Sequence, residues 1–211
     1  MSTTTSNLSL IKPELQDEKH QTIQDLANNF QKLDDVSERY TSSPPTSGNH
    51  VVSQRIWNNQ PSVGGFAGWI CTRTGRAAPK WVGLTSYSIG SIIVPTADNG
   101  HVYECIQAGY SAVLEPSFPV SGGAEIQDTR GATTWIPNKS YNFQDVVFPT
   151  VDNGRFYVCT VAGDSGIFEP VWAASDGLTT TDGTVVWSSY RIARWREAGI
   201  ATMYRPFGKI E

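Results

Sequence analysis

The sequence contains little charge, few cysteines and no long hydrophobic run. Only 17% of its 211 residues are charged, and the net charge of -4 comes from scattered residues, so a basic surface for nucleic acid is not expected. No stretch approaches the roughly 18 apolar residues of a membrane helix. The N-terminus also lacks the basic and apolar regions of a secretory signal. We therefore expect no nucleic acid partner, no membrane insertion and no export through an N-terminal signal.

The three cysteines do not form a regular disulfide framework. Cys71, Cys105 and Cys159 are odd in number and widely spaced, which matches no paired pattern of a zinc site. We expect them to be small buried residues, although a bridge between Cys105 and Cys159 stays open. Asp98 and Asp152 each stand beside an Asn-Gly pair and supply too few oxygens for calcium. Since no glycine-rich phosphate loop is present either, we expect no metal and no cofactor.

What the sequence does contain is an internal repeat. Residues 81–128 and 135–182 align without gaps at an offset of 54, with 18 identical residues in 48 positions. The segments PTADNGHVYEC and PTVDNGRFYVC are the most similar part. Such self-similarity indicates a duplication. A Trp follows each copy, so that Trp135 is expected both to end the first copy and to open the second, and Trp187 to end the second.

Each copy has the pattern of a small antiparallel β module. A short apolar strand is followed by an Asn-Gly pair, which suits a hairpin turn, and then by a returning strand. A third strand is expected to end at Trp135 in the first copy and at Trp187 in the second. The fold class is therefore mainly β: an N-terminal α-helix, able to form a short trimeric coiled coil, followed by two tandem small antiparallel β modules.

The segment 14–40 differs from the rest and has the apolar period of a helix, with Pro13 close to its start. A helix with such a stripe needs a partner, and we expect oligomerisation with other copies of the chain or docking on another protein. Packing against its own chain is the alternative. The residues of the expected oligomerisation stripe are Ile23, Leu26, Phe30, Leu33 and Tyr40.

The two copies resemble a known family. The order of a Trp, a Tyr, an apolar strand, Asn-Gly-x-x-Tyr-x-Cys, a Gly-containing loop, Glu-Pro and a closing Trp is similar to the small chitin- and cellulose-binding modules of bacterial chitinases, which recur in phage tail and fibre proteins. The resemblance covers Trp81–Trp187. One departure is Gln144, where the first copy has Gly90. The resemblance implies weak sugar binding through exposed aromatic rings, strengthened by having several copies.

The candidate sugar-binding residues are aromatic, with two carboxylates for hydrogen bonds to hydroxyl groups. Tyr87 and Tyr141 are favoured because they lie beside loops. Each Glu-Pro pair is expected mainly to fix a loop, with hydrogen bonding to sugar hydroxyls as the secondary possibility. For the rings, the alternative to sugar binding is that they form the module cores. Exposure of Tyr87, Tyr141 and Trp172 would distinguish the two. The full set of candidates is Tyr87, Tyr141, Trp172, Trp81, Trp135, Trp187, Glu115 and Glu169.

Both ends of the chain resemble phage structural proteins. The opening NLSLIKPELQDEK is similar to segments that attach a fibre to the particle, and GFAGWICTRTGRAAPKW and RPFGKIE are similar to elements of tail-fibre and spike proteins. Residues 203–210 are expected to pair with strands near residues 69–72. The expected organisation is an anchoring helical segment (1–40), a linker (41–64), a β element that pairs with the C-terminus (65–80), the two repeats (81–134 and 135–187) and a C-terminal segment (188–211).

No catalytic residues are expected. Gly163–Gly166 spells the GDSG string of serine proteases, but the first copy has GYSA in the same register, and none of the three histidines has a plausible setting for a base. Glu115 and Glu169 belong to separate copies, whereas a glycosidase needs two carboxylates facing each other across a cleft. The chain is therefore not expected to be an enzyme.

Together these features predict a bacteriophage virion protein, assembled in the host cytoplasm. Residues 1–40 would join a homotrimer to other virion proteins, and the β modules of this fibre, spike or appendage would bind a glycan on the host surface. One alternative is a structural head-fibre, collar or tail decoration protein that binds no sugar. Another is the binding module of a polysaccharide-degrading enzyme.

Overall fold

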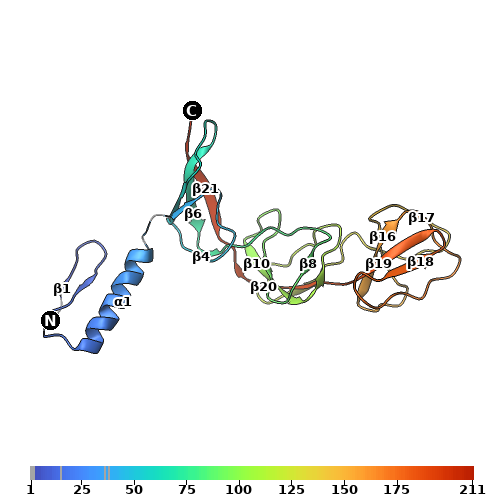
Figure 1. Cartoon of the computed structure of the whole chain (residues 1–211), viewed down its shortest axis with the longest axis horizontal. Helices are drawn as coiled ribbons and strands as arrows, with labels where there is room; N and C mark the ends of the chain where they lie inside the picture. The colour runs from blue at the N-terminus through green and yellow to red at the C-terminus, as the bar shows by residue number, and fades with distance from the viewer. Residues whose placement is uncertain (1–2, 15, 36, 38) are drawn as a thin grey trace. The chain divides into compact units, whose positions relative to one another are not determined.

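The computed structural model describes residues 3–14, 16–35, 37 and 39–211. It is mainly β, as the sequence predicts, with several small sheets and a single helix in the described ranges (Figure 1). The chain divides into two compact units. One comprises residues 1–44, 52–72 and 204–211, and the other residues 45–51 and 73–203. The second unit therefore interrupts the first along the chain.

The first unit contains a hairpin, a helix and a four-stranded sheet in the order β21-β6-β5-β3. β3 pairs with β5 in parallel, and β5 pairs with β6 antiparallel. Although β6 and β21 are far apart in the sequence, they are neighbours, which is the pairing expected for the C-terminal segment (Figure 1). Two strands of the first unit, β6 and β21, extend by one residue into the second. The elements of the first unit are β1 (Thr3–Thr4), β2 (Ile11–Lys12), α1 (Lys19–Asp35), β3 (Arg39–Thr41), β5 (Arg55–Asn58), β6 (Phe66–Arg73) and β21 (Met203–Lys209).

The helix is shorter than the sequence pattern predicts. α1 ends at Asp35, and the N–H of Ser37 donates to the carbonyl of Asp34 in a turn. Tyr40 does not belong to the helical stripe: it lies in β3 opposite Trp57 of β5. The assignment of Tyr40 to the oligomerisation stripe is therefore wrong, because pairing with β5 overrides the local helical spacing.

In the second unit, the first copy builds a sheet in the order β12-β20-β10-β9 and a small pair, β11 with β8. The second copy builds β13-β15-β16-β19-β18 and the pair β14 with β17. A further pair joins β4 to β7. These strands are β4 (Asn49–His50), β7 (Gly75–Arg76), β8 (Ser86–Tyr87), β9 (Ile92–Ile93), β10 (His101–Gln107), β11 (Gly109–Tyr110), β12 (Glu125–Gln127), β13 (Thr133–Thr134), β14 (Ser140–Tyr141), β15 (Val146–Phe148), β16 (Arg155–Val161), β17 (Gly163–Asp164), β18 (Thr179–Asp182), β19 (Val185–Arg191) and β20 (Arg194–Ile200).

The third strand of the first copy is not the one that the sequence predicts. β10 pairs antiparallel with β20, so the strand comes from beyond the second copy and not from the segment ending at Trp135 (Figure 1). In the second copy the equivalent strand β16 pairs with β19, which contains Trp187 as expected. The second copy is thus inserted between two strands of the first. Trp135 belongs to the second copy, and Trp195 of β20 closes the first.

A turn in which a residue with positive φ donates its N–H to a cysteine carbonyl occurs three times. Gly90 and Gln144 both have positive φ (83° and 71°), and the N–H of each donates at 2.8 Å to the carbonyl of Cys105 or Cys159. Ser53 has φ 73° and donates in the same way to Cys71 at 2.9 Å. The departure at Gln144 therefore leaves the local turn unchanged. The segment around Cys71 repeats the turn of the two copies, which the sequence comparison did not detect.

The cores of the second unit are aromatic. One cluster surrounds Tyr103 and Trp195 in the first copy, and a second surrounds Tyr157 and Trp187 in the second. A third cluster contains Val146, Phe156, Val158 and Ile192, with Leu84 and Tyr110 of the first copy packed against it. Because this third cluster draws on both copies, it joins them through a buried apolar contact.

Candidate functional site

Each copy is built around a buried carboxylate that binds two indole groups. Oδ2 of Asp128 accepts the Nε1–H groups of Trp81 and Trp195 at 2.7 and 2.9 Å, and Oδ1 accepts the N–H of Ala112 at 3.1 Å. Asp128 is fully buried. Burial raises its pKa, and the hydrogen bonds from Trp81 and Trp195 oppose that shift. We call Asp128 with its two Trp residues the first Trp–Asp–Trp cluster.

The second copy repeats this arrangement. Oδ2 of Asp182 accepts the Nε1–H groups of Trp135 and Trp187 at 2.7 and 3.1 Å, and Oδ1 accepts the N–H of Gly166 at 2.7 Å. The indole rings of Trp81, Trp135 and Trp187 are buried, with at most 7% exposed. These three candidates are core residues whose polar edges are already paired, so they offer no ring face to a sugar.

The two favoured tyrosines are also structural. The hydroxyl of Tyr87 accepts the N–H of Val82 at 2.9 Å, and that of Tyr141 accepts the N–H of Ile136 at the same distance. Tyr141 is buried and Tyr87 is half-buried, and both rings pack edge-on against a core Trp. Burial raises the pKa of both phenols. The expectation that these two rings are exposed is therefore wrong.

The Glu-Pro pairs fix loops. Oε1 of Glu115 accepts the N–H of Thr96 at 2.7 Å, and Oε1 of Glu169 accepts that of Thr150 at 2.8 Å. The threonine hydroxyl donates to the other carboxylate oxygen in both copies. Trp172 is half-buried, and its Nε1–H donates to Glu169 at 2.8 Å. Burial alone would raise the pKa of Glu169, but these hydrogen bonds outweigh that effect and the pKa is lowered. Both carboxylates are thus engaged within the chain.

The remaining chemically suggestive residues have structural contacts as well. Ser165 of the GDSG string donates to the carbonyl of Ile136 at 2.8 Å, as Ser111 of the first copy donates to Val82 at 2.7 Å. Cys71, Cys105 and Cys159 are buried, and Cys105 and Cys159 do not form a bridge.

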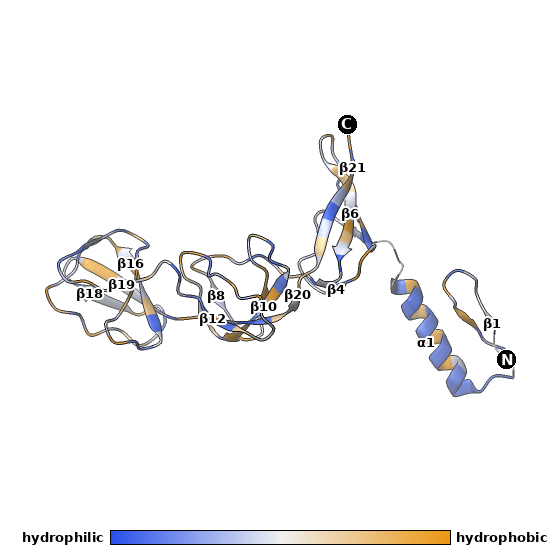
Figure 2. Ribbon diagram, turned by 180° about the vertical axis from the view of Figure 1, so that it is seen from behind, coloured by the Kyte–Doolittle hydropathy of each residue, from blue (hydrophilic) through white to orange (hydrophobic). Residues whose placement is uncertain are grey.

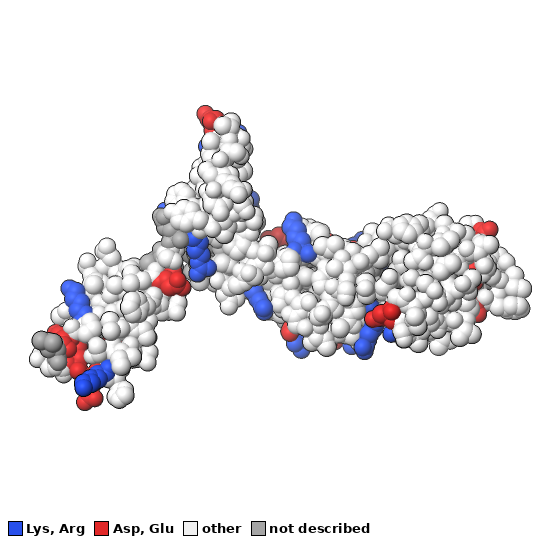
Figure 3. Space-filling model, in the orientation of Figure 1, with Lys and Arg blue, Asp and Glu red and all other residues white. Residues whose placement is uncertain are grey.

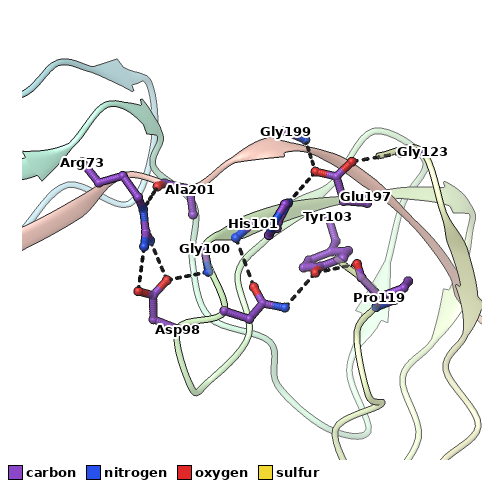
Figure 4. Close-up of polar contacts among 11 residues, drawn as sticks. Arg73, Asp98, Gly100, His101, Tyr103, Pro119, Gly123, Glu197, Gly199 and Ala201 are labelled. Carbon is purple, nitrogen blue, oxygen red and sulfur yellow. Dashed lines mark hydrogen bonds and ion pairs between the residues drawn. The ribbon is translucent and has the colours of Figure 1, made fainter. Parts of the chain in front are cut away.

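A polar network surrounds the Asn-Gly turn of the first copy (Figure 4). Arg73 donates to both carboxylate oxygens of Asp98, at 2.6 and 3.0 Å, and its Nε–H donates to the carbonyl of Ala201 at 2.6 Å. Asp98 also accepts the N–H of Gly100 at 3.1 Å. Gly100 has φ 92°, a conformation that glycine adopts without strain. The network therefore ties the turn to the segment that follows β20.

On the other side of this turn, His101 contacts Glu197 of β20. The two side chains are 2.8 Å apart, and Glu197 also accepts the N–H groups of Gly123 at 3.0 Å and Gly199 at 2.8 Å (Figure 4). His101, the first residue of β10, is half-buried. The hydrogen bond from His101, followed by those from the two backbone groups, lowers the pKa of Glu197 even though burial opposes it.

We expect this contact to make stability depend on pH. The pKa of Glu197 in the folded chain is lowered from its ordinary value of 4.5. The ionised carboxylate therefore stabilises the fold fully above about pH 4.5, and this contribution is lost as the pH falls through the lowered pKa. Thermal melts between about pH 7 and about pH 3 should show the wild-type chain losing its advantage over Glu197→Gln in acid. A difference in melting temperature that stays constant over this range would contradict the assignment.

α1 turns its polar side chains towards the N-terminal hairpin. The side-chain amide of Asn29 accepts the N–H of Ile11 at 2.8 Å and donates to its carbonyl at 2.7 Å. Lys32 donates to the carbonyl of Ser9 at 2.7 Å, and Asp25 is buried. The hydrophobic residues of this mostly hydrophilic helix (Figure 2) are exposed. They are Ile23 (66% exposed), Leu26 (41%), Phe30 (67%) and Leu33 (43%).

A hollow of about 180 Å³ lies between the two copies. Leu84 and Tyr110 line it from the first copy and Tyr190 from β19; the remaining lining residues, from the second copy, are Phe143, Gln144, Val158, Cys159 and Thr160. The rings of Tyr110 and Tyr190 pack at 4.1 Å between centroids. Sequence analysis did not identify this hollow, which we call the inter-copy cleft, because residues of both copies form it.

Comparisons with known proteins do not assign the chain to a family: no family model, curated protein or solved structure matches it. Within the described ranges, no helix is long and apolar enough to span a membrane. The same residues contain no group of three or more His, Cys, Asp or Glu side chains suited to holding a metal ion. On the face that Figure 3 shows, basic and acidic side chains are scattered and form no continuous basic patch.

Proposed function

We propose that the chain is an oligomeric structural protein of a bacteriophage virion, a fibre or similar appendage. Residues 1–40 would join the copies, as a homotrimer, and attach them to other virion proteins, and the β modules would project as a spacer or decoration. The observation that carries the proposal is the apolar stripe of α1, formed by Ile23, Leu26, Phe30 and Leu33, which is exposed on the single chain.

The exposure of the apolar face of α1, and the burial of polar residues on the other face, support oligomerisation. In most helices that pack on their own chain the apolar face is covered, but here the hairpin contacts polar Asn29, and Asp25 is the other buried residue of the helix. A 17-residue helix is only marginally stable alone in water. Burial of a Leu, Ile or Phe side chain contributes roughly 1.5–3 kcal/mol, so association of several copies along this stripe would stabilise the helix substantially. The positions are spaced by three and four residues, as in coiled coils.

The aromatic residues favour a structural role for the β modules. The rings of Trp81, Trp135, Trp187 and Tyr141 are buried, and Glu115 and Glu169 are occupied by loop contacts. None of these residues offers the exposed ring or free carboxylate that sugar binding at those positions would need. We therefore favour the fibre or decoration protein without sugar binding at these residues, and we assign no catalytic role to the chain.

The oligomeric state of the full chain tests the proposal. We expect light scattering to show a trimer and the double variant Leu26→Asp, Phe30→Asp to be a monomer, since charges buried in a helix seam cost several kcal/mol. The control is Gln24→Asp, Asn28→Asp, which adds the same charge at exposed polar positions of α1 and should stay trimeric. A wild-type chain that is monomeric at all concentrations would contradict the proposal and favour a detached binding module.

The virion assignment has its own test. Purified particles from the host that carries the gene should contain the protein by mass spectrometry. Deletion of residues 1–40 should remove it from the particles while it remains in the lysate. Absence of the intact protein from particles, or attachment without these residues, would contradict the assignment.

A further inference from the structure

We propose that a hollow beside the Asn-Gly turn of the second copy binds a phosphoryl group or a similar tetrahedral oxyanion. The hollow has a volume of about 300 Å³, and we call it the arginine hollow. This inference goes beyond the proposed function and does not depend on it, because all the residues of the hollow belong to one chain. They are Gln107, Asn153, Gly154, Arg155 and Arg191.

The arginine hollow contains two positive side chains that lie opposite each other. Arg155 of β16 is paired with Arg191 of β19 in an antiparallel ladder. The Cβ atoms of directly opposed residues lie about 5 Å apart, and like charges in such positions destabilise a sheet. No acidic side chain is among the described residues that line the hollow. An anion bound between the two guanidinium groups would therefore remove a repulsion.

The carboxylate next to this pair balances only one of the two charges. Oδ1 of Asp176 accepts from Nη1 of Arg155 at 2.6 Å and from the backbone N–H of Arg191 at 2.9 Å. Among the residues that the structure describes, none makes a hydrogen bond or ion pair with the guanidinium group of Arg191. Asp152 accepts the N–H of Gly154 at 2.8 Å and lines a different hollow. The charge of Arg191 is thus left for a ligand.

The first copy shows that the fold does not require this second arginine. There, Glu197 contacts His101 at 2.8 Å and accepts the N–H of Gly199 at the same distance (Figure 4). In the second copy Asp176 makes the equivalent contacts, but Arg191 stands at the position of Gly199. The carboxylate contact therefore forms without a side chain at this position. Arg191 adds a charge that the folding of the module does not use, and binding of an anion explains it.

The groups available in the arginine hollow are hydrogen-bond donors. Nη1 of Arg155 donates to Asp176 at 2.6 Å and to Ser189 at 3.1 Å, and these contacts hold the guanidinium group in place. Its Nε–H and Nη2–H groups make no hydrogen bond within the described chain. Both ends of the Asn153 amide are occupied, since Oδ1 accepts the N–H of Arg155 at 3.1 Å and Nδ2 donates to Tyr157 at 2.8 Å. A ligand would therefore meet mainly guanidinium donors.

A tetrahedral oxyanion suits these donors. Guanidinium groups bind phosphate oxygens through parallel N–H bonds. Two opposed guanidinium groups need an acceptor with oxygens on more than one side, which phosphate and sulfate provide, whereas the two oxygens of a carboxylate lie in one plane. The volume of about 300 Å³ is at the lower end of the range for small-molecule sites. The occupant would therefore be a terminal phosphate or a single phosphodiester unit.

The test is titration of the full chain with anions at constant ionic strength, followed by backbone amide NMR shifts. The probes are inorganic phosphate, sulfate, glycerol 3-phosphate and dimethyl phosphate, with acetate as a planar anion. We expect at least one tetrahedral anion to shift the amides of Gly154, Arg155 and Arg191 saturably, and acetate to bind at least fivefold more weakly. Either ester supports the proposal: tighter binding of glycerol 3-phosphate would identify a monoester as the ligand, and tighter binding of dimethyl phosphate a diester.

Two arginine variants separate a specific site from general attraction by charge. Arg191→Gln should weaken phosphate binding at least fivefold. Because this change removes the repulsion with Arg155, the melting temperature without phosphate should equal or exceed that of the wild type. Arg196→Gln removes the same charge from a pair with Glu104 outside the hollow and should bind as the wild type does.

Three results would overturn the proposal. The first is that no tetrahedral anion shifts these amides saturably. The second is that Arg191→Gln binds as the wild type does, or that both arginine variants weaken binding equally. The third is that acetate binds as tightly as phosphate. A monomeric wild-type chain would contradict the proposed function but would leave the anion titration unchanged.

Discussion

Replacement of Asp128 by Ala should unfold the sheet of the first copy. The carboxylate accepts hydrogen bonds from Trp81, Trp195 and Ala112 inside a fully buried cluster. Without it, three buried N–H groups lose their acceptor, each at a cost of about 1–3 kcal/mol. The total is comparable to the about 5–15 kcal/mol that stabilises a whole domain. We expect the melting temperature, followed by near-UV circular dichroism of the tryptophans, to fall by more than about 10 °C.

The matched control for this substitution is Glu125→Gln in β12 of the same sheet. Glu125 is exposed and lies 3.8 Å from Arg194, a type of ion pair that contributes little. Its removal should change the melting temperature by no more than about 2 °C. If Asp128→Ala behaved like Glu125→Gln, the Trp–Asp–Trp cluster would not be the centre of the core. The conservative variant Asp128→Asn should have an intermediate effect, because one acceptor oxygen remains.

The second large effect is expected for Gly109→Ala, at the point where the chain returns from the second copy. A Cβ at Gly109 would lie 2.4 Å from the carbonyl oxygen of Arg191 and 2.7 Å from backbone atoms of Ile192 and Ala193. These atoms belong to the backbone and cannot rotate away, so the two segments would have to separate. Overpacking of this kind costs about 1–3 kcal/mol or more. We expect a clearly lower melting temperature and faster proteolysis near residue 192.

Gly122→Ala provides the comparison. Gly122 has an ordinary φ, and a Cβ there would come no closer than 3.8 Å to Glu197, so the substitution should be tolerated. Similar melting temperatures for the two alanine variants would show that the crossing of the two segments has room to adjust. Gly75→Ala should destabilise the fold as Gly109→Ala does, because a Cβ at Gly75 would lie 2.5 Å from the carbonyl oxygen of Ile200.

Local features were predictable because they depend on neighbouring residues. The Asn-Gly turns, the returning strands β10 and β16, and the helical period of Ile23–Leu33 all follow from local conformational preference and periodicity. The loop-fixing role of the Glu-Pro pairs, which the sequence favours over sugar contacts, is supported by the contacts of Glu115 and Glu169. A third occurrence of the turn could have been found from the spacing of Cys71, Cys105 and Cys159, each followed by Gly four residues later.

Long-range pairing was not predictable from local pattern. The first copy takes its third strand from β20, and only the hydrogen bonds of Asp128 show that Trp195, not Trp135, is its second indole. Tyr40 has the spacing of the helix but pairs with β5. The exposure of Tyr87 and Tyr141 was misjudged because a position beside a loop does not tell whether a ring points into the core.

The sequence by itself determined the duplication, the mainly β class and the presence of an amphipathic helix, since repetition and periodicity are properties of the chain. Only the tertiary structure decided which strand completes the first copy, which face of α1 stays uncovered, and that a cleft forms where the copies meet. These depend on contacts between residues far apart in the chain, which no local pattern encodes.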